Sequence, residues 1–262
     1  MKKIFISFLL LLSISAFSFG NVVNLDGIFQ GKNLYVMNPF SSSGVGFCVY
    51  EVKVNGQVTT DEINSSAFEI DLSLYQLKLG DKLEVEIKHK ENCKPKVLNP
   101  EVLKPKSTFK TVKIDVSKDG YLNWTTTGET GELPYEVQQY RWNKWVKVGT
   151  IEGKGTPGTN TYKYKVNAHS GNNRFRVRQM DYTKKANYST NADFRSMSPP
   201  ISFEPQKATT TINFSGETQY EVYDYYGNIV LKGVGTKIDI SKLAKGDYFL
   251  NYDNSMDTFK KK

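Results

Sequence analysis

The sequence predicts an all-β protein made of tandem small β-sandwiches. Short segments that alternate apolar and polar residues recur along the chain, as expected for strands with one buried face and one wet face. The 16 Tyr and 15 Phe residues, together with abundant Thr and Val, also favour strands. Long apolar segments with the period of a helix are absent from the sequence.

Residues 1–20 have the pattern of a secretory signal peptide. Lys2 and Lys3 precede an apolar run over 4–17, and Gly20 is a small residue of the kind found at a cleavage site. No later segment approaches the roughly 20 apolar residues that a membrane helix needs, so we expect an exported protein that does not span a membrane. Turn signals and composition divide the remaining chain into three expected domains, at 21–110, 111–205 and 206–262.

The first domain, 21–110, is expected to be an N-terminal β-sandwich. Asn55-Gly56 is the strongest short hairpin signal in the chain, because both residue types tolerate a positive φ. Alternating strands are expected at 33–37, 47–54, 67–72 and 83–89. Through the V-x-V-N-G turn and the L-G-D-K-L-x-V strand, the domain resembles carboxypeptidase-regulatory-like (transthyretin-like) modules. The resemblance implies a module without chemistry of its own.

The chain has two cysteines, Cys48 and Cys93, both in the first domain. In an oxidising compartment an even pair of this kind predicts one disulfide, and two free buried thiols are the alternative. Closing such a loop would stabilise the fold by roughly 4 kcal/mol in the chain-entropy model. The two cysteines with His89 and His169 make no recognisable metal-ligand spacing, so no metal site is expected.

A proline-rich segment over 92–105 follows the last strand of the first domain. Pro95, Pro100 and Pro105 recur among lysines, and prolines exclude both a helix and a central strand. We expect an extended connector packed along the first domain. A partner-docking strap is the alternative, because the apolar side chains between the prolines need a surface to pack on.

The middle domain, 111–205, is expected to be a seven-strand sandwich, because short strands and turn signals follow one another closely. Strands are expected at 112–116, 120–127, 135–140, 145–149, 162–166 and 174–182. The runs L-x-W-T-T, Y-x-V-x-x-Y, W-x-K-V-G and F-R-V-R-Q-M-D-Y resemble the fibronectin type III-like module that often precedes type IX sorting domains.

A candidate partner-binding surface lies in this middle domain. Arg174, Arg176 and Arg178 fall on one face of a strand, because side chains alternate with period two. A cationic, aromatic surface of this kind suits an acidic partner or a sugar, whereas the alternative is a solvated outer sheet face. The candidate residues are Arg141, Trp142, Trp145, Arg174, Arg176 and Arg178.

The last domain, 206–262, has two strands around a turn at 226–228, a further short turn and a last hairpin. The residues that carry its pattern are Asp224, Gly227, Leu243, Gly246, Tyr248, Lys260, Lys261 and Lys262. With the D-x-x-G turn, the I-D-I-S-x-L run, the G-x-Y-x-L strand and the basic tail in order, it resembles the type A C-terminal sorting domain of the type IX secretion system. That family is a small β-sandwich, read by the outer-membrane translocon and usually removed afterwards.

No catalytic constellation is recognisable, so no enzyme and no cofactor are expected. The sequence has no Gly-x-Ser-x-Gly elbow, no His-Glu-x-x-His and no phosphate loop. The formal net charge of +8 is weak support for a nucleic-acid partner in an exported protein, and none is expected.

Two non-enzymatic functions remain. The run at 203–206 lacks the Asn-Pro pair with which sorting domains usually begin, and no effector domain is expected ahead of the label. Both features favour a component of the secretion apparatus. Through 33–40 and the proline-rich segment, the whole chain resembles the plug protein of the type IX translocon. The resemblance implies a periplasmic protein at the outer membrane whose partner is the translocon barrel. The alternative is secreted or surface-attached cargo, an adhesin or structural interaction protein with a sorting domain.

Overall fold

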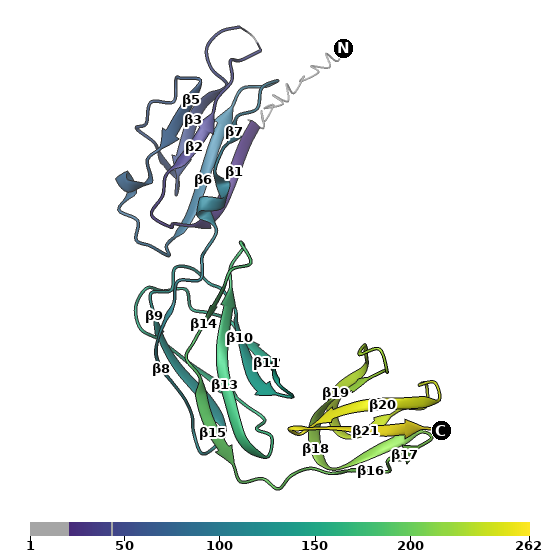
Figure 1. The fold of residues 1–262 in the computed structure, drawn as a ribbon. Helices are drawn as coiled ribbons and strands as arrows, with labels where there is room; N and C mark the ends of the chain where they lie inside the picture. The colour runs from purple at the N-terminus through teal and green to yellow at the C-terminus, as the bar shows by residue number, and fades with distance from the viewer. Residues whose placement is uncertain (1–20, 43) are drawn as a thin grey trace, which may run out of the picture. The chain divides into compact units, whose positions relative to one another are not determined.

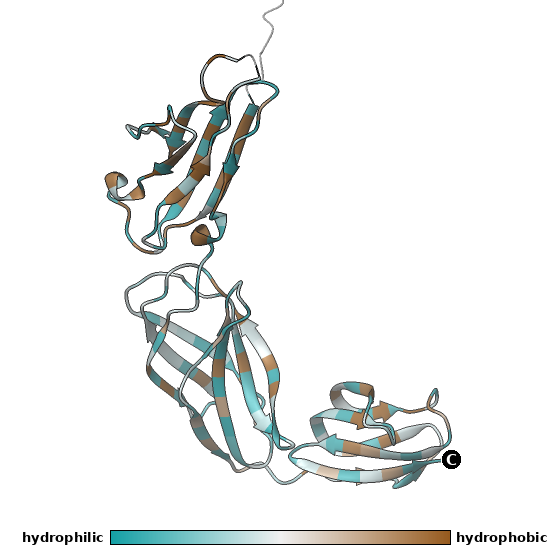
Figure 2. Ribbon diagram, turned by 45° about the horizontal axis from the view of Figure 1, so that its top comes forward, coloured by the Kyte–Doolittle hydropathy of each residue, from teal (hydrophilic) through white to brown (hydrophobic). Residues whose placement is uncertain are grey.

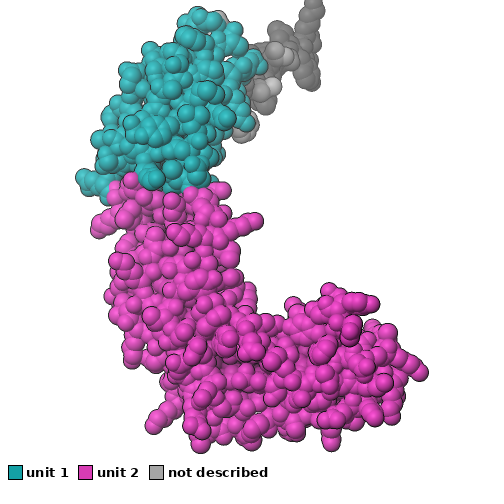
Figure 3. All heavy atoms as spheres, in the orientation of Figure 1, with its two compact units in different colours: residues 1–26, 32–76, 83–102 teal, residues 27–31, 77–82, 103–262 magenta. Residues whose placement is uncertain are grey.

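The computed structural model describes residues 21–42 and 44–262, so the predicted signal peptide at 1–20 lies outside the described residues. The chain divides into two compact units (Figure 3). Among the described residues, the first contains 21–26, 32–76 and 83–102, and the second contains 27–31, 77–82 and 103–262. The division therefore falls after residue 102, ahead of the expected domain boundary at 110.

The predicted all-β fold class is confirmed, because strands make up nearly all the regular structure (Figure 1). The elements before residue 104 are β1 (Asn21–Ile28), β2 (Leu34–Met37), β3 (Val49–Val54), β4 (Gln57–Val58), β5 (Ala67–Ile70), η1 (Leu72–Tyr75), β6 (Lys82–His89), β7 (Lys96–Val97) and η2 (Pro100–Leu103). They form one sheet in the order β1-β6-β3-β4 and another in the order β5-β2-β7. Their fully buried side chains include Leu34, Val36, Val52, Val85 and Ile87.

The Asn55-Gly56 hairpin is confirmed, since both residues have positive φ, 48° and 80°, and Val54 pairs with Gln57. Backbone angles of this sign at both turn positions match the twist of the two flanking strands.

The proline-rich segment contributes residues 92–102 to the first unit. Lys96 and Val97 form β7, which pairs with β2 at the edge of its sheet, and Pro95 is buried. The expectation that prolines exclude any helical turn here is wrong, because Pro100 begins the 3₁₀ helix η2. A proline at the first position of a helical turn loses no hydrogen bond, since that N–H would have no partner inside the turn.

The middle module is a two-sheet sandwich, in which apolar and polar residues alternate along the strands (Figure 2). Its strands are β8 (Lys110–Val116), β9 (Tyr121–Thr127), β10 (Tyr135–Arg141), β11 (Lys144–Ile151), β12 (Asn160–Lys165), β13 (Gly171–Met180), β14 (Ala186–Tyr188) and β15 (Ala192–Ser196). One sheet runs β11-β10-β13-β14 with β15 also on β13, and the other runs β12-β9-β8. Trp124, Tyr135 and Phe175 are its largest fully buried side chains.

The sandwich has eight strands instead of the seven expected, because the chain after β13 forms two short strands, β14 and β15. β14 pairs with the end of β13 and β15 with its beginning. Between them, Ser189 accepts a hydrogen bond from the Val177 backbone N–H through its hydroxyl oxygen, at 2.9 Å, and its own N–H donates to the Val177 carbonyl.

The C-terminal module is a single folded sheet of six strands with its own core. Its strands are β16 (Phe203–Glu204), β17 (Lys207–Ala208), β18 (Thr211–Tyr223), β19 (Ile229–Asp239), β20 (Gly246–Tyr252) and β21 (Ser255–Lys261). They run in the order β16-β18-β20-β21-β17, with β19 paired to β18. Ile212, Val222, Ile238, Ile240 and Leu250 are buried there.

Across residues 21–42 and 44–262, the structure contains no helix with the length and apolar character needed to cross a bilayer.

Candidate interaction sites on the middle and C-terminal modules

The turn between β18 and β19 is held by the carboxylate of Asp224. Its oxygens accept hydrogen bonds from the Tyr226 and Asn228 backbone N–H groups, at 2.9 and 2.8 Å, and from the Asn228 side-chain amide at 3.0 Å. Bonds to the Asn228 side chain and backbone, with those of the turn, lower the pKa of Asp224. Gly227 takes a φ of 82°, as the turn requires. The side chains of Tyr225 and Tyr226 are left 80% and 87% exposed.

The other residues of the sorting-like pattern mainly build the module. Tyr248 is buried, stacks on Phe259 with ring centroids 5.4 Å apart, and donates a hydrogen bond to the Ala244 carbonyl. Leu243 packs against the core, and Gly246 opens β20 opposite Lys261. The basic tail is therefore largely strand: Lys260 and Lys261 lie in β21, Lys261 is buried, and Lys262 follows.

The three predicted arginines do lie on one face of β13. Opposite them on β10 stand Tyr140, Gln138 and Glu136, facing Arg174, Arg176 and Arg178 respectively. The Arg176 guanidinium carbon lies 4.0 Å from the centre of the Trp145 ring and 4.2 Å from that of Tyr188. The cation is thus enclosed between two aromatic rings, and this burial lowers the pKa of Arg176.

The remaining arginines of this face have carboxylate partners. Arg174 Nε lies 3.1 Å from Asp193 and Arg178 lies 2.9 Å from Glu136. We define the Arg–Trp face as Tyr140, Trp145, Arg174, Arg176, Arg178 and Tyr188. Because two of its cations have carboxylate partners and Arg176 lies between two rings, its free binding groups are mainly ring surface, with Tyr140 37% and Tyr188 43% exposed. Its role in binding a partner stays a prediction.

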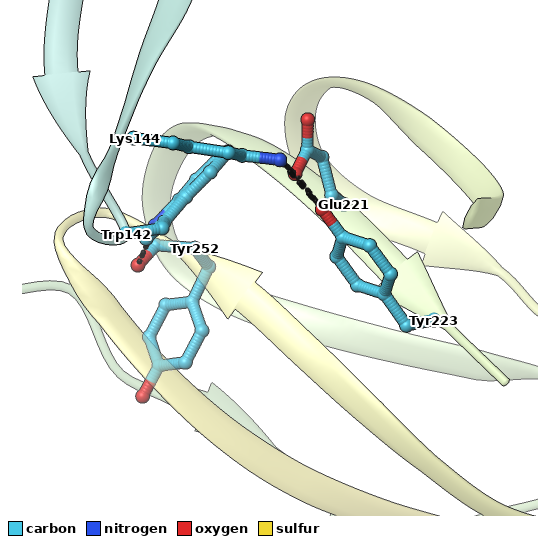
Figure 4. A network of polar contacts seen from close by, with 5 residues as sticks. All are labelled: Trp142, Lys144, Glu221, Tyr223 and Tyr252. Carbon is cyan, nitrogen blue, oxygen red and sulfur yellow. Dashed lines mark hydrogen bonds and ion pairs between the residues drawn. The ribbon is translucent and has the colours of Figure 1, made fainter. Parts of the chain in front are cut away.

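Arg141 and Trp142 do not belong to this face. Arg141 follows Tyr140 in the strand, so its side chain takes the opposite face, where it donates to Gln139 Oε1 at 2.6 Å. Trp142 and Asn143 form the β10–β11 turn with φ of 52° and 58°. This turn carries the Trp142 ring to the C-terminal module, where its Nε1 donates to the Tyr252 carbonyl at 3.4 Å (Figure 4). The Trp142 side chain is buried.

A polar network joins the same turn to β18 (Figure 4). Lys144 Nζ lies 2.6 Å from Glu221 Oε2 and 2.6 Å from the Tyr223 hydroxyl, which in turn donates to Glu221. Burial alone would lower the pKa of Lys144, but its hydrogen bonds to Glu221 and Tyr223 outweigh burial and raise it. The cation is therefore held charged at this site.

A second connection runs through Asp253, at the turn that joins β20 to β21. Its carboxylate accepts hydrogen bonds from the Ser170 N–H at 2.8 Å, from the Ser170 hydroxyl and from the Ile201 N–H at 3.3 Å. Arg141 is buried nearby, and this burial lowers its pKa to about 10 although Asp253 and Glu221 favour the charged form. We call the contacts of Trp142, Lys144 and Ser170 with Glu221, Tyr223, Tyr252 and Asp253, with Arg141 buried beside them, the junction.

His169 lies at the junction, in the wall of a cavity of about 300 Å³ that Arg141 and Asp253 also line. Its ring Nδ1 is 2.7 Å from the Ser170 carbonyl. Burial lowers the pKa of His169 and the charge of Arg141 lowers it further, against the raising effects of the Ser170 carbonyl and Asp253. The neutral ring is therefore the form that the fold favours.

A pH prediction follows from His169. A base with a lowered folded-state pKa binds fewer protons when folded, so its contribution to stability is complete above the unfolded pKa of about 6.5 and is lost as pH falls below it. The free energy of unfolding in urea should decline between about pH 7 and pH 5, and less steeply in His169→Gln. Equal slopes in the two proteins would contradict this account.

A buried carboxylate that sequence reasoning did not single out lies in the middle module. Glu129 is 2% exposed and accepts hydrogen bonds from the Tyr135 hydroxyl at 2.9 Å, the Tyr162 hydroxyl at 2.8 Å and the Gly155 N–H at 2.9 Å. Thr126 donates to it as well. In the sequence it follows three threonines and Gly128 at the end of a strand, a pattern typical of a solvated turn.

The predicted disulfide between Cys48 and Cys93 is confirmed. The structure also brings His89 beside these cysteines, with its ring nitrogen and both sulfurs within 4.8 Å of one another. Sequence spacing did not show this grouping, because β3 and β6 come together only through sheet pairing, Val49 opposite His89. With both sulfurs in the disulfide, the group offers no thiolate ligands.

One protein family matches the chain: the secretion system C-terminal sorting domain, over residues 204–262. The match spans the C-terminal module from β16 onward. The chain is thus related to type IX secretion and carries the sorting tail of exported proteins that are secreted or attached to the surface. No curated protein matches the chain at a significant level.

Several solved β-rich structures are similar to the chain at low scores. A tetra-tandem repeat from the extending region of a large adhesion protein is 12% identical with a TM-score of 0.33, covering 92% of this chain and 73% of that one. Fibronectin domains FN1–FN3 of chicken CNTN1 are 10% identical with a TM-score of 0.25, covering 93% and 98%. Dimeric latent PorU from Porphyromonas gingivalis is 11% identical with a TM-score of 0.23, covering 92% and 31%. TM-scores this low do not describe a shared overall arrangement, so none of these names is carried over to this chain.

Proposed function

We propose that this chain is cargo of the type IX secretion pathway, secreted or attached to the cell surface, and that the modules ahead of its sorting domain bind partners and perform no catalysis. The observation that carries the proposal is the match of 204–262 to a secretion system C-terminal sorting domain. In the structure the same residues form a folded module, from β16 to β21.

The same observation supports cargo more than the translocon plug. The missing Asn-Pro pair at 203–206 is a feature of the sequence that favours the plug. In the structure Phe203 and Glu204 nevertheless form the first strand of the module, paired with Phe214 and Asn213 of β18. The departure in sequence thus leaves the fold of the module intact, and what it bears on is whether the module is removed after export. The plug remains the second candidate, with the translocon barrel as its partner.

A binding role is supported by the Arg–Trp face. Tyr140 and Tyr188 present partly exposed rings on either side of the stack of Trp145 and Arg176. Rings held in place by a cation offer flat contact area at little cost in conformational entropy. We propose a sugar as the ligand class that suits this surface, because its rings are free for stacking whereas its arginines already have partners.

The test is to follow the tagged chain in the organism that makes it. We expect it in the medium or on the cell surface, and we expect mass spectrometry under denaturing conditions to find a cut ahead of or within 204–262. Deleting 204–262 should leave the protein in the periplasm, because the export label is then missing. The control is a deletion of Met197 alone, an exposed linker residue ahead of the module.

Recovery of the uncut chain only from the periplasm, bound to an outer-membrane barrel after mild detergent extraction, would replace the cargo proposal by the plug. Turnover of any substrate by the purified protein would contradict the non-catalytic part of the proposal.

A further inference from the structure

We propose that the sorting domain is docked on the middle module through the junction, and that it stays bound when the linker between the two modules is cut. The linker, 197–202, lies between β15 and β16, and Met197 within it is 89% exposed. A protease can therefore reach the linker while the modules remain packed. This inference stands on the junction itself and does not depend on the route of export.

The anchor of the junction is Trp142. A tryptophan at the tip of a hairpin would be largely exposed in an isolated module, yet this side chain is only 5% exposed. It bonds to the backbone of Tyr252, while Arg141 and Lys144 lie 5.2 and 5.9 Å from its ring. Buried tryptophans with cations around them are the residues that most often dominate the binding energy of an interface.

Charge complementarity surrounds this anchor. The middle module supplies the cations Arg141 and Lys144, and the C-terminal module supplies the carboxylates of Glu221 and Asp253. Arg141, Glu221 and Asp253 are 3%, 8% and 3% exposed. Buried charges of this kind persist only where opposite charges and hydrogen bonds compensate their lost hydration. In a module that moved freely on its linker, these charged side chains would be exposed to solvent.

The junction is also fixed at separate points. Trp142 and Lys144 come from the β10–β11 turn, whereas Ser170 precedes β13 and contacts Asp253 from a different loop. On the other side, the contacts reach both β18 and the β20–β21 turn. Contacts from two loops to two places set both position and orientation, as in a specific interface.

The consequence is that cutting the linker would not by itself release the sorting domain. Cutting removes only the high effective concentration that a short tether provides. The domain then leaves at the rate set by the junction, so the processed protein would carry its own label as a non-covalent subunit.

The test uses the purified chain from residue 21 to 262 with a protease site inserted between Ser198 and Pro199, outside the residues that contact Asp253. After cutting, we expect the two fragments to elute together in size exclusion at micromolar concentration. Trp142→Ala should weaken their association by roughly tenfold or more, so that they elute apart, and Lys144→Glu should act in the same direction. Trp145→Ala is the matched control on the same hairpin, because this ring faces Arg176 and not the junction; its cut fragments should still elute together.

Separate elution of the cut wild-type fragments would overturn the proposal. So would co-elution of the cut Trp142→Ala fragments at every dilution at which the wild-type complex persists. Circular dichroism and thermal unfolding of the uncut variants distinguish a lost interface from a lost fold. Because the measurement uses purified protein, its failure leaves the export proposal untouched, and failure of the export proposal leaves this one untouched.

Discussion

Replacing Glu129 by alanine should destabilise the middle module by about 3 to 5 kcal/mol, because a buried donor that loses its acceptor costs about 1 to 3 kcal/mol and several donors lose theirs together. The carboxylate is the shared acceptor for the hydroxyls of Thr126, Tyr135 and Tyr162 and for the Gly155 N–H. Burial and the neighbouring carboxylate raise the pKa of both tyrosines, so both keep a proton to donate. Without Glu129, all four donors would be left in a core that excludes water, and each would lose an acceptor.

The measurement is the free energy of unfolding in guanidinium chloride, followed by the fluorescence of Trp124, which lies 5.1 Å from the Tyr162 ring. Glu129→Gln is the graded control: its amide oxygen still accepts while its NH₂ group adds donors, so it should cost less than alanine. Glu132→Ala, a few residues on and exposed, should leave stability nearly unchanged. A loss below about 0.5 kcal/mol in Glu129→Ala would show that the network does not hold this end of the sandwich together.

Removing the disulfide should cost about 4 kcal/mol in the first unit, estimated from the chain entropy of the closed loop. Cys48 and Cys93 are 45 residues apart in sequence, and the cross-link restricts the unfolded chain far more than the folded one. The double variant Cys48→Ser, Cys93→Ser should therefore unfold at a lower denaturant concentration, and adding a reductant to the wild type should have the same effect.

The second unit is the internal control, since its stability should not depend on a disulfide between Cys48 and Cys93, both of which lie in the first unit. Its transition can be followed separately by tryptophan fluorescence, because Trp124, Trp142 and Trp145 all lie in that unit and the chain has only 3 Trp. If the first unit unfolded at the same denaturant concentration after reduction, the packing of β3 and β6 would be enough to stabilise it without the disulfide.

Much of the fold could be predicted because its signals are local. Period-two alternation identified β2, β3, β5 and β6 within a residue or two, and Asn55-Gly56 specified a hairpin through the φ values it tolerates. β1 and β7 were not expected. The two residues of β7 are too few to show a period, and the side chains of β1 are mostly exposed or half-buried.

The candidate site was predicted only in part, for a different reason. Alternation correctly placed Arg174, Arg176 and Arg178 on one face, because parity within a strand is a local property. It did not place Arg141, because the strand expected at 135–140 ended one residue before it, and it did not show that Trp142 takes a positive φ in the turn, on the other side of the hairpin from Trp145. Those positions depend on where the hairpin ends.

The sequence by itself thus determined the class of the fold, the cysteine pair and the sorting-type module, since each depends on residue types at short, regular spacing. Only the tertiary structure decided which polar groups are buried and which groups they pair with. Glu129 accepts from a tyrosine 33 residues away, and Lys144 pairs with Glu221 across 77 residues. Such partners meet because sheets and modules pack, and a burial that depends on a distant segment leaves no periodic mark in the sequence around either residue.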